Sequence, residues 1–135
     1  MSESYDTSWD ISRSERGTVP YSEEAFERKY SEWQRRKWPA WLLAHLTFPF
    51  TVVRMEDEDD AYFTNAAKRQ PFRLGHTMTA VAVEMEEDPK YGMLLQVKEG
   101  RHKGYVPLAD VEVTSKDDAN FWPVREYVVW FANRG

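Results

Sequence analysis

Apolar and polar residues alternate in three runs between residues 71 and 113, and two compact polar turns separate the runs. The runs cover residues 77–85, 92–98 and 105–113, and the third contains a Pro-bearing corner. A period of two residues, bounded by Gly, Pro and Asp clusters, is typical of β-strands. In the first run this alternation places Met78, Ala80, Ala82 and Glu84 on one face. The pattern predicts a three-stranded meander, which one more strand can close into a small barrel.

Helical periodicity flanks the meander on both sides. Ser22 is a good N-cap, and Phe26, Tyr30 and Trp33 recur on one helix face until Pro39 ends or kinks the helix. We expect a second short helix at 40–46, a strand at 51–55 and an aromatic C-terminal helix at 118–133. Residues 1–20 are polar and predict a flexible tail, so residues 21–135 form the single predicted domain. The expected fold is α+β: a small SH3-like antiparallel β-barrel at 48–113, flanked by helices at 22–46 and 118–133.

Composition removes several classes of function. The 135 residues include no cysteine, which excludes disulfides, thiol catalysis and thiolate metal sites. No apolar run reaches the roughly 18 residues of a membrane span, and the N-terminus lacks the apolar segment of a secretory signal. The formal net charge of −5 disfavours nucleic acid and anionic membranes as partners. We therefore expect a cytoplasmic protein that binds neither.

Motifs for catalysis are not found in the sequence. It has no nucleophile elbow, no phosphate-cradling glycine loop and no H-E-x-x-H. His45, His76 and His102 are far apart and show no ligand spacing, so we expect them on the surface or in packing contacts. The chain is predicted not to be an enzyme.

Several short motifs follow one another in a distinctive order. FPFT at 48–51 precedes a polar connection, a hairpin with an acidic tip at 86–92, and YVPLADVE at 105–112. In this order they resemble the small acidic calcium-binding proteins of cyanobacteria of the CcbP type, over roughly residues 40–113. The resemblance implies a non-EF-hand Ca²⁺ binder acting as an intracellular buffer or sensor. Lys90 is a departure within the tip, where it would weaken a cation site if it pointed inward.

Acidic residues concentrate in two runs, EDEDD at 56–60 and EMEED at 84–88. Ca²⁺ takes about six to eight oxygen ligands, and a divalent cation relieves the repulsion between crowded carboxylates. An EF-hand is excluded because a loop starting at Asp57 would place Lys68 at its twelfth position. The two runs are either one shared site or two sites, and solvated loops are the alternative interpretation. The candidate metal ligands are Asp57, Asp59, Asp60, Glu84, Glu86, Glu87 and Asp88.

A protein-interaction module is the second function that the sequence supports. A Pro-bearing corner before the last strand is similar to the end of an SH3-type domain, which binds partner peptides through aromatic grooves. The aromatic candidates for such a groove are Tyr62, Phe63, Tyr91 and Trp122. A basic stretch at 28–37 is interleaved with Glu27 and Glu32, which favours a solvated helix face. The same stretch could dock on the acidic loops of a neighbouring molecule, and the sequence leaves the oligomeric state open.

Overall fold

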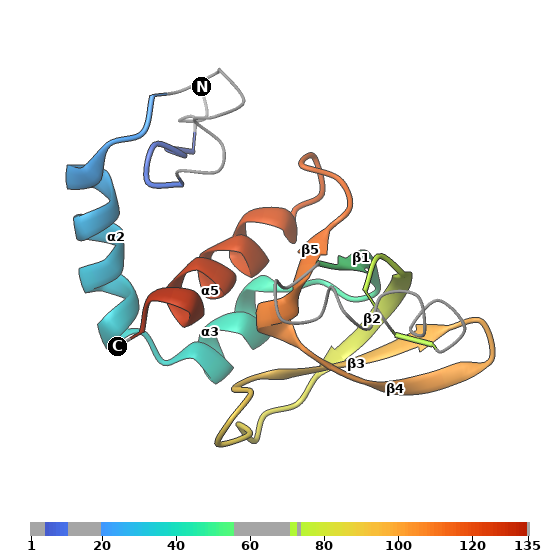
Figure 1. Ribbon diagram of the computed structural model, residues 1–135. Helices are drawn as coiled ribbons and strands as arrows, with labels where there is room; N and C mark the ends of the chain where they lie inside the picture. Colours follow the sequence, from blue (N-terminus) through green and yellow to red (C-terminus); the bar gives the residue numbers. More distant parts are fainter. Residues whose placement is uncertain (1–4, 11–19, 56–70, 73, 135) are drawn as a thin grey trace. The chain divides into compact units, whose positions relative to one another are not determined.

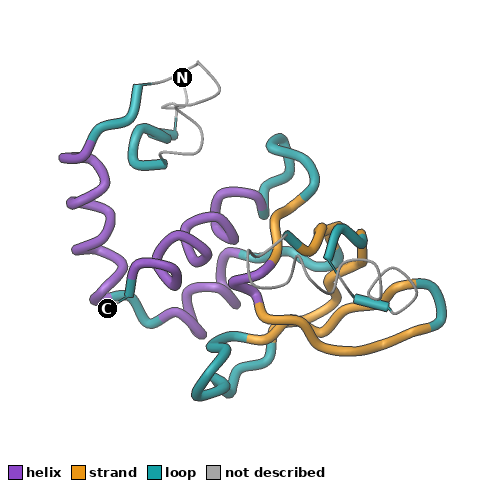
Figure 2. Tube along the Cα trace, in the orientation of Figure 1, coloured by secondary structure: helices purple, strands orange, loops and turns teal. Residues whose placement is uncertain are grey.

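The computed structural model describes residues 5–10, 20–55, 71–72 and 74–134 (Figure 1). The chain divides into two compact units, residues 1–36 and residues 37–135. Helices and strands are separated along the chain, as Figure 2 shows, and all described strands of the second unit lie between two helices in the sequence. No described helix is long and apolar enough to cross a membrane.

The first unit is built around helix α2, Glu23–Arg35. The Ser22 side-chain oxygen accepts a hydrogen bond from the Ala25 N–H at 3.1 Å, which confirms the predicted N-cap. The helix ends at Arg35, before Pro39 is reached. Trp33 is fully buried, and the Trp9 ring meets it edge-on with the ring centroids 5.3 Å apart. The described part of the predicted tail, residues 5–10, therefore packs on α2.

Two helices of the second unit pack together through aromatic rings. Helix α3 spans Trp38–His45, and Pro39 lies in its first turn, where a missing N–H costs nothing. Helix α5 spans Phe121–Asn133. Trp38 of α3 lies 5.3 Å from Tyr127 and 5.2 Å from Trp130 of α5, measured between ring centroids. The predicted short helix and aromatic C-terminal helix are both present.

One five-stranded antiparallel sheet forms the rest of the second unit. The strands lie in the order β4-β3-β2-β1-β5, so the predicted meander is present and β1 joins it as predicted. The 3-10 helix η2, Leu108–Asp110, divides the third predicted run into two strands. Both β4 and β5 are edges, so the described sheet is open, and the expected closed SH3-like barrel is not confirmed. The strand bounds are β1 Phe50–Arg54, β2 Thr77–Val83, β3 Leu94–Glu99, β4 His102–Pro107 and β5 Val111–Val113.

A β-bulge in β2 changes the predicted face of its second half. The register with β3 shifts between Ala80 and Ala82, so Val81 is an extra residue opposite a shorter stretch of β3. Ala80 is fully buried, as the alternation predicts, but after the bulge the buried residue is Val83. The predicted placement of Glu84 on the face of Ala80 is therefore wrong, because one extra residue exchanges the two faces of the strand.

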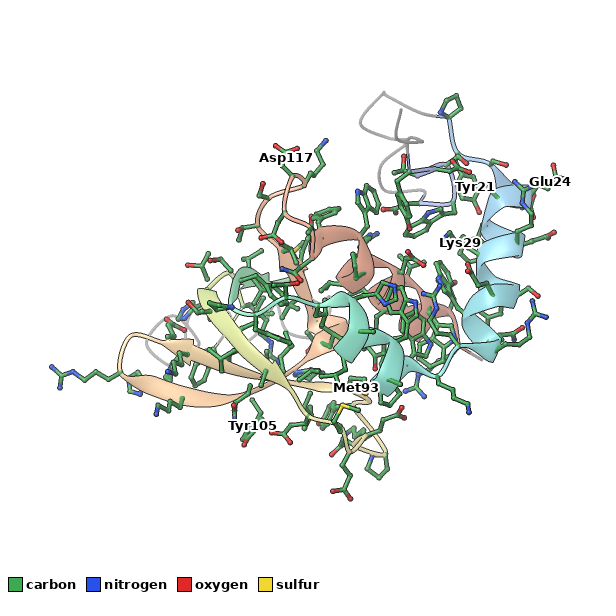
Figure 3. All side chains as sticks on the ribbon, turned by 180° about the vertical axis from the view of Figure 1, so that it is seen from behind. Tyr21, Glu24, Lys29, Met93, Tyr105 and Asp117 are labelled. Atoms are coloured by element: carbon green, nitrogen blue, oxygen red, sulfur yellow. The ribbon has the colours of Figure 1, made fainter. Side chains whose placement is uncertain are left out.

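The two faces of the sheet have different surroundings. Leu95, Val97 and Val106 are fully buried on one face. On the other face Tyr105 is 55% exposed, and Figure 3 shows its ring projecting away from α3. Helix α5 packs against β5, η2 and α3. Neither helix of the second unit covers the outer face of β2, β3 and β4 (Figure 1).

Candidate functional site

The connection between β2 and β3 is a narrow hairpin with its acidic residues near the tip. The Glu84 N–H donates to the Leu94 carbonyl at 2.9 Å, which continues the ladder beyond the end of β2. Asp88 and Gly92 then exchange two backbone hydrogen bonds, at 2.8 and 2.9 Å. The tip is thus held at two levels by the backbone.

Asp88 organises the turn at the tip through its own side chain. Its Oδ1 accepts hydrogen bonds from the backbone N–H groups of Lys90, at 2.8 Å, and Tyr91, at 2.9 Å. These bonds, with that of Tyr91 the stronger influence, lower the pKa of the Asp88 carboxyl below its ordinary value of 3.8. One oxygen of Asp88 is therefore committed to the turn, and Oδ2 is left for a ligand.

Helix α5 anchors the base of the hairpin. The Tyr127 hydroxyl accepts a hydrogen bond from the Met93 N–H at 2.9 Å, and both residues are buried. Gly92 has φ of +72°, and a methyl group there would approach the Phe131 ring to 2.6 Å. Burial, with a smaller contribution from the negative charge of Glu87, raises the pKa of Tyr127 to about 12 against the opposing hydrogen bond from Met93. The Tyr127 hydroxyl therefore stays neutral at physiological pH and responds to charge on the hairpin.

The four hairpin carboxylates predicted as ligands line one groove. Its volume is about 400 Å³, and its wall also includes Pro89, Leu94 and Tyr105. The Lys90 ammonium group lies 5.2 Å from the centre of the Tyr91 ring, a cation–π contact on the tip. The acidic lining consists of Glu84, Glu86, Glu87 and Asp88.

The donors of this groove fit a hard cation by their chemistry. Carboxylate oxygens are the ligands that Ca²⁺ prefers, whereas nitrogen and sulfur donors favour transition metals. In the part of the chain that the structure describes, however, no three His, Asp or Glu side chains gather closely enough to hold an ion. Glu86 and Glu87 are exposed and Glu84 is half-buried. These side chains would have to turn toward one another to share a cation.

The other candidate ligands, Asp57, Asp59 and Asp60, lie outside the described residues. The last described residue before them, Met55, follows β1 at the end of the sheet where Val53 pairs with Thr77. Glu84 follows the opposite end of β2, and a seven-residue strand is about 23 Å long. Whether the two acidic runs share one site stays a prediction.

A polar cluster ties together the two described segments that flank residues 56–70. Arg54 donates to the Phe72 carbonyl at 2.9 Å and pairs with Asp110 at 3.1 Å. The Phe72 N–H donates to Glu99 at 2.7 Å, and His76 Nδ1 lies 2.9 Å from the same carboxylate. Partial burial alone would raise the pKa of Glu99, but the bonds from Phe72 and His76 outweigh it and lower the pKa. This cluster explains His76 as a structural residue.

No ring contact joins the two described candidates for the predicted aromatic groove, and the groove stays a prediction. Tyr91 is exposed on the hairpin tip, whereas Trp122 lies on α5 with its ring 4.9 Å from that of Phe121. Tyr62 and Phe63 lie outside the described residues. In the basic stretch, Lys29 and Arg36 pair with Glu32 at 3.6 and 3.4 Å, but the Arg36 side chain is only 8% exposed, so the expected solvated helix face is not confirmed for these two residues.

Two tyrosines important to the hairpin were not predicted from the sequence. Tyr105 borders the acidic groove, and Tyr127 holds the hairpin base. The sequence signal for the second contact is Gly92, because a glycine beside a strand often marks a close approach of another element.

Comparison with known proteins gives one family. Searches among curated proteins and among solved structures found no match. A family model for calcium binding, Calci_bind_CcbP, matches residues 27–131, which is most of the chain. That range includes β1, the acidic hairpin and nearly all of α5. The chain therefore belongs to the CcbP family of calcium-binding proteins.

Proposed function

We propose that this protein binds Ca²⁺ at the acidic hairpin and serves as a non-EF-hand calcium buffer or sensor. The observation that carries the proposal is the groove at the hairpin that connects β2 to β3, which four carboxylates line within five residues of chain. Membership of a calcium-binding family supports the identity of the cation.

Electrostatic repulsion supplies the driving force for binding. Four carboxylates of one groove repel each other in a protein whose net charge is already −5. Glu84, Glu86 and Glu87, with Oδ2 of Asp88, would hold the cation, and water or backbone carbonyls would complete the six to eight or so oxygen ligands. Ordering exposed glutamates costs side-chain entropy, roughly 1.5–2 kcal/mol each, which reduces the affinity.

The anchor on α5 provides a way to distinguish a sensor from a buffer. Glu87 already acts electrostatically on Tyr127, so neutralising Glu87 would change the surroundings of a buried tyrosine. A sensor would change the packing of α5 when it binds Ca²⁺, and a buffer would leave α5 unchanged. Asp57, Asp59 and Asp60 form a second candidate site in this proposal. A cytoplasmic location is also part of it, supported by the cysteine-free composition.

Isothermal titration calorimetry with Ca²⁺, and with Mg²⁺ at equal concentration, tests the proposal. The variant E84Q/E86Q/E87Q should lose most of the Ca²⁺ heat, because it removes three negative charges and keeps side-chain size. A matched control, E24Q/E27Q/D117N, neutralises three exposed acids outside both acidic runs and should bind as the wild type does.

A third variant, D57N/D59N/D60N, separates the two acidic runs. Loss of binding in this variant alone would move the site away from the hairpin. Thermal unfolding gives an independent readout, because Ca²⁺ at about 100 times its Kd should add roughly 2.7 kcal/mol to the free energy of unfolding. Wild-type protein that shows neither heat nor a stability gain with Ca²⁺ would refute the proposed function.

A further inference from the structure

The outer face of β2, β3 and β4 carries a second groove beside the acidic one. Its volume is about 480 Å³, and its lining includes Val81, Gln96, Lys98, Lys103 and Tyr105. Tyr105 lines both grooves, so they adjoin at its ring. Together they form one continuous surface, called here the outer groove face.

The side chains of this face are set by the strand pattern. Gln96 and Lys98 alternate with the fully buried Leu95 and Val97, so they point outward from β3. The Gln96 amide donates to the Tyr105 hydroxyl at 3.3 Å, across the register pair that these residues form. Tyr105 therefore presents a large, 55% exposed ring in the middle of the face. An exposed aromatic ring of this kind is typical of binding surfaces.

Charge on the outer groove face is divided between its ends. The hairpin carboxylates border the groove at one end. At the other end Lys98 and Lys103 are directly opposite each other on β3 and β4. Like charges in that position repel, and no ion pair to either lysine is found among the described residues. An anionic group bound between the two lysines would relieve this repulsion.

The size of the face selects the kind of occupant. Strands of seven and six residues are about 20 Å long, and three strands at roughly 4.8 Å spacing present a face of only a few hundred Å². A stable dimer needs about 800 Å² from each partner. An extended segment of six or seven residues, at about 3.3 Å per residue, spans the same length.

We propose that the outer groove face binds an extended segment of a partner protein. The segment is basic where it meets the hairpin carboxylates, apolar where it crosses Tyr105 and Val81, and acidic where it meets Lys98 and Lys103. The basic end and Ca²⁺ would use the same carboxylates, so Ca²⁺ would weaken binding of the segment and the segment would weaken binding of Ca²⁺. This competition, unlike the docking itself, rests on the proposed function.

Selection from a display library of random octapeptides, against the full chain in chelator, tests the docking. The enriched peptides should be basic at one end, apolar in the middle and acidic at the other. Fluorescence anisotropy of a labelled enriched peptide should show at least about tenfold weaker binding to K98E/K103E and to Y105A. K37E/K116E and Y21A change exposed residues elsewhere and should bind the peptide normally. Circular dichroism checks folding, and K98Q/K103Q replaces the charge-reversed variant if that variant unfolds.

Three results would overturn the docking proposal. They are a selection that enriches no peptide, enriched peptides that lack the charge order, and peptide binding that is unchanged in Y105A. Sedimentation that shows a dimer lost in Y105A would make the occupant a second copy instead.

The competition has its own readout. Ca²⁺ should release the peptide from the wild type. The variant E84Q/E86Q/E87Q should bind the peptide more weakly, because the basic end loses its partners, and added Ca²⁺ should cause no further release. If calorimetry shows that the protein binds Ca²⁺ and the affinity for the peptide does not change with Ca²⁺, the competition is refuted and docking is left intact. Absence of both Ca²⁺ heat and a stability gain would refute the proposed function, and the competition with it, but would leave docking intact.

Discussion

Gly92 offers a quantitative test of how α5 holds the acidic hairpin. In Gly92→Ala the new methyl group meets two obstacles, a backbone φ of +72° and the rings of Tyr127 and Phe131. The left-handed backbone costs roughly 1–2 kcal/mol for a non-glycine residue, and overpacking a buried site costs about 1–3 kcal/mol. We therefore expect the free energy of unfolding to fall by about 2–5 kcal/mol.

Gly75 provides a matched control for the backbone part of this cost. Its φ is +77°, but a methyl group there would have no atom within 4 Å. Gly75→Ala should therefore cost only the backbone share, roughly 1–2 kcal/mol. Urea unfolding measures both variants, and with a slope of about 2 kcal/mol per M their midpoints should differ by roughly 0.5–1.5 M. Equal midpoints would mean that steric contact with α5 adds nothing to the cost of a side chain at Gly92.

Three further predictions concern single groups. Tyr127→Phe should lower the free energy of unfolding by about 1–3 kcal/mol, because it leaves the buried Met93 N–H without its acceptor. Hydrogen exchange should then be faster at the Met93 amide, and an unchanged rate would contradict this. Asp88→Asn keeps the acceptor that forms the turn but removes the charge, so Ca²⁺ heat should fall while the melting temperature holds, whereas Asp88→Ala should lower both. The lowered pKa of Glu99 stabilises the fold above its ordinary value of 4.5, and this stability is lost as the pH falls from 4.5 through the lower folded-state pKa. Acid titration of stability should therefore be flatter in Glu99→Gln than in the wild type, and equal slopes would show that the hydrogen bonds from the Phe72 N–H and from His76 do not stabilise the ionised carboxylate.

Local patterns in the sequence were enough to predict most of the elements. The N-cap at Ser22, the meander and the aromatic C-terminal helix follow from side-chain period and capping chemistry, which act over a few residues. The phase of β2 could not be predicted, because residues 80–83 are all apolar and give no preference for one register. Closure of the sheet into a barrel likewise depends on contacts between its two edge strands, which are far apart in the sequence. The local alternation of apolar and polar residues does not predict such contacts.

The candidate site was predictable in composition but not in geometry. Four of the proposed ligands line one groove because they are neighbours along one hairpin. The role of Asp88 in the turn and the anchor at Tyr127 depend on backbone geometry and on a contact across 34 residues of chain. The role of Tyr105 could not be predicted, because its exposure follows from how the strands pair. In the sequence it is one aromatic residue among many.

Because of the bulge at Val81, the direction in which the hairpin leaves the sheet does not depend on the residues at its tip. The number of residues in β2 decides which side of the sheet the chain leaves, whatever side chains the tip carries. Mutations that lengthen, shorten or recharge the tip can therefore accumulate without turning it toward the core. Deletion of one residue in β2 would do the opposite, since it would leave every acid unchanged and direct Glu84 inward. For the direction of the hairpin, therefore, the length of the strand matters and the composition of the tip does not.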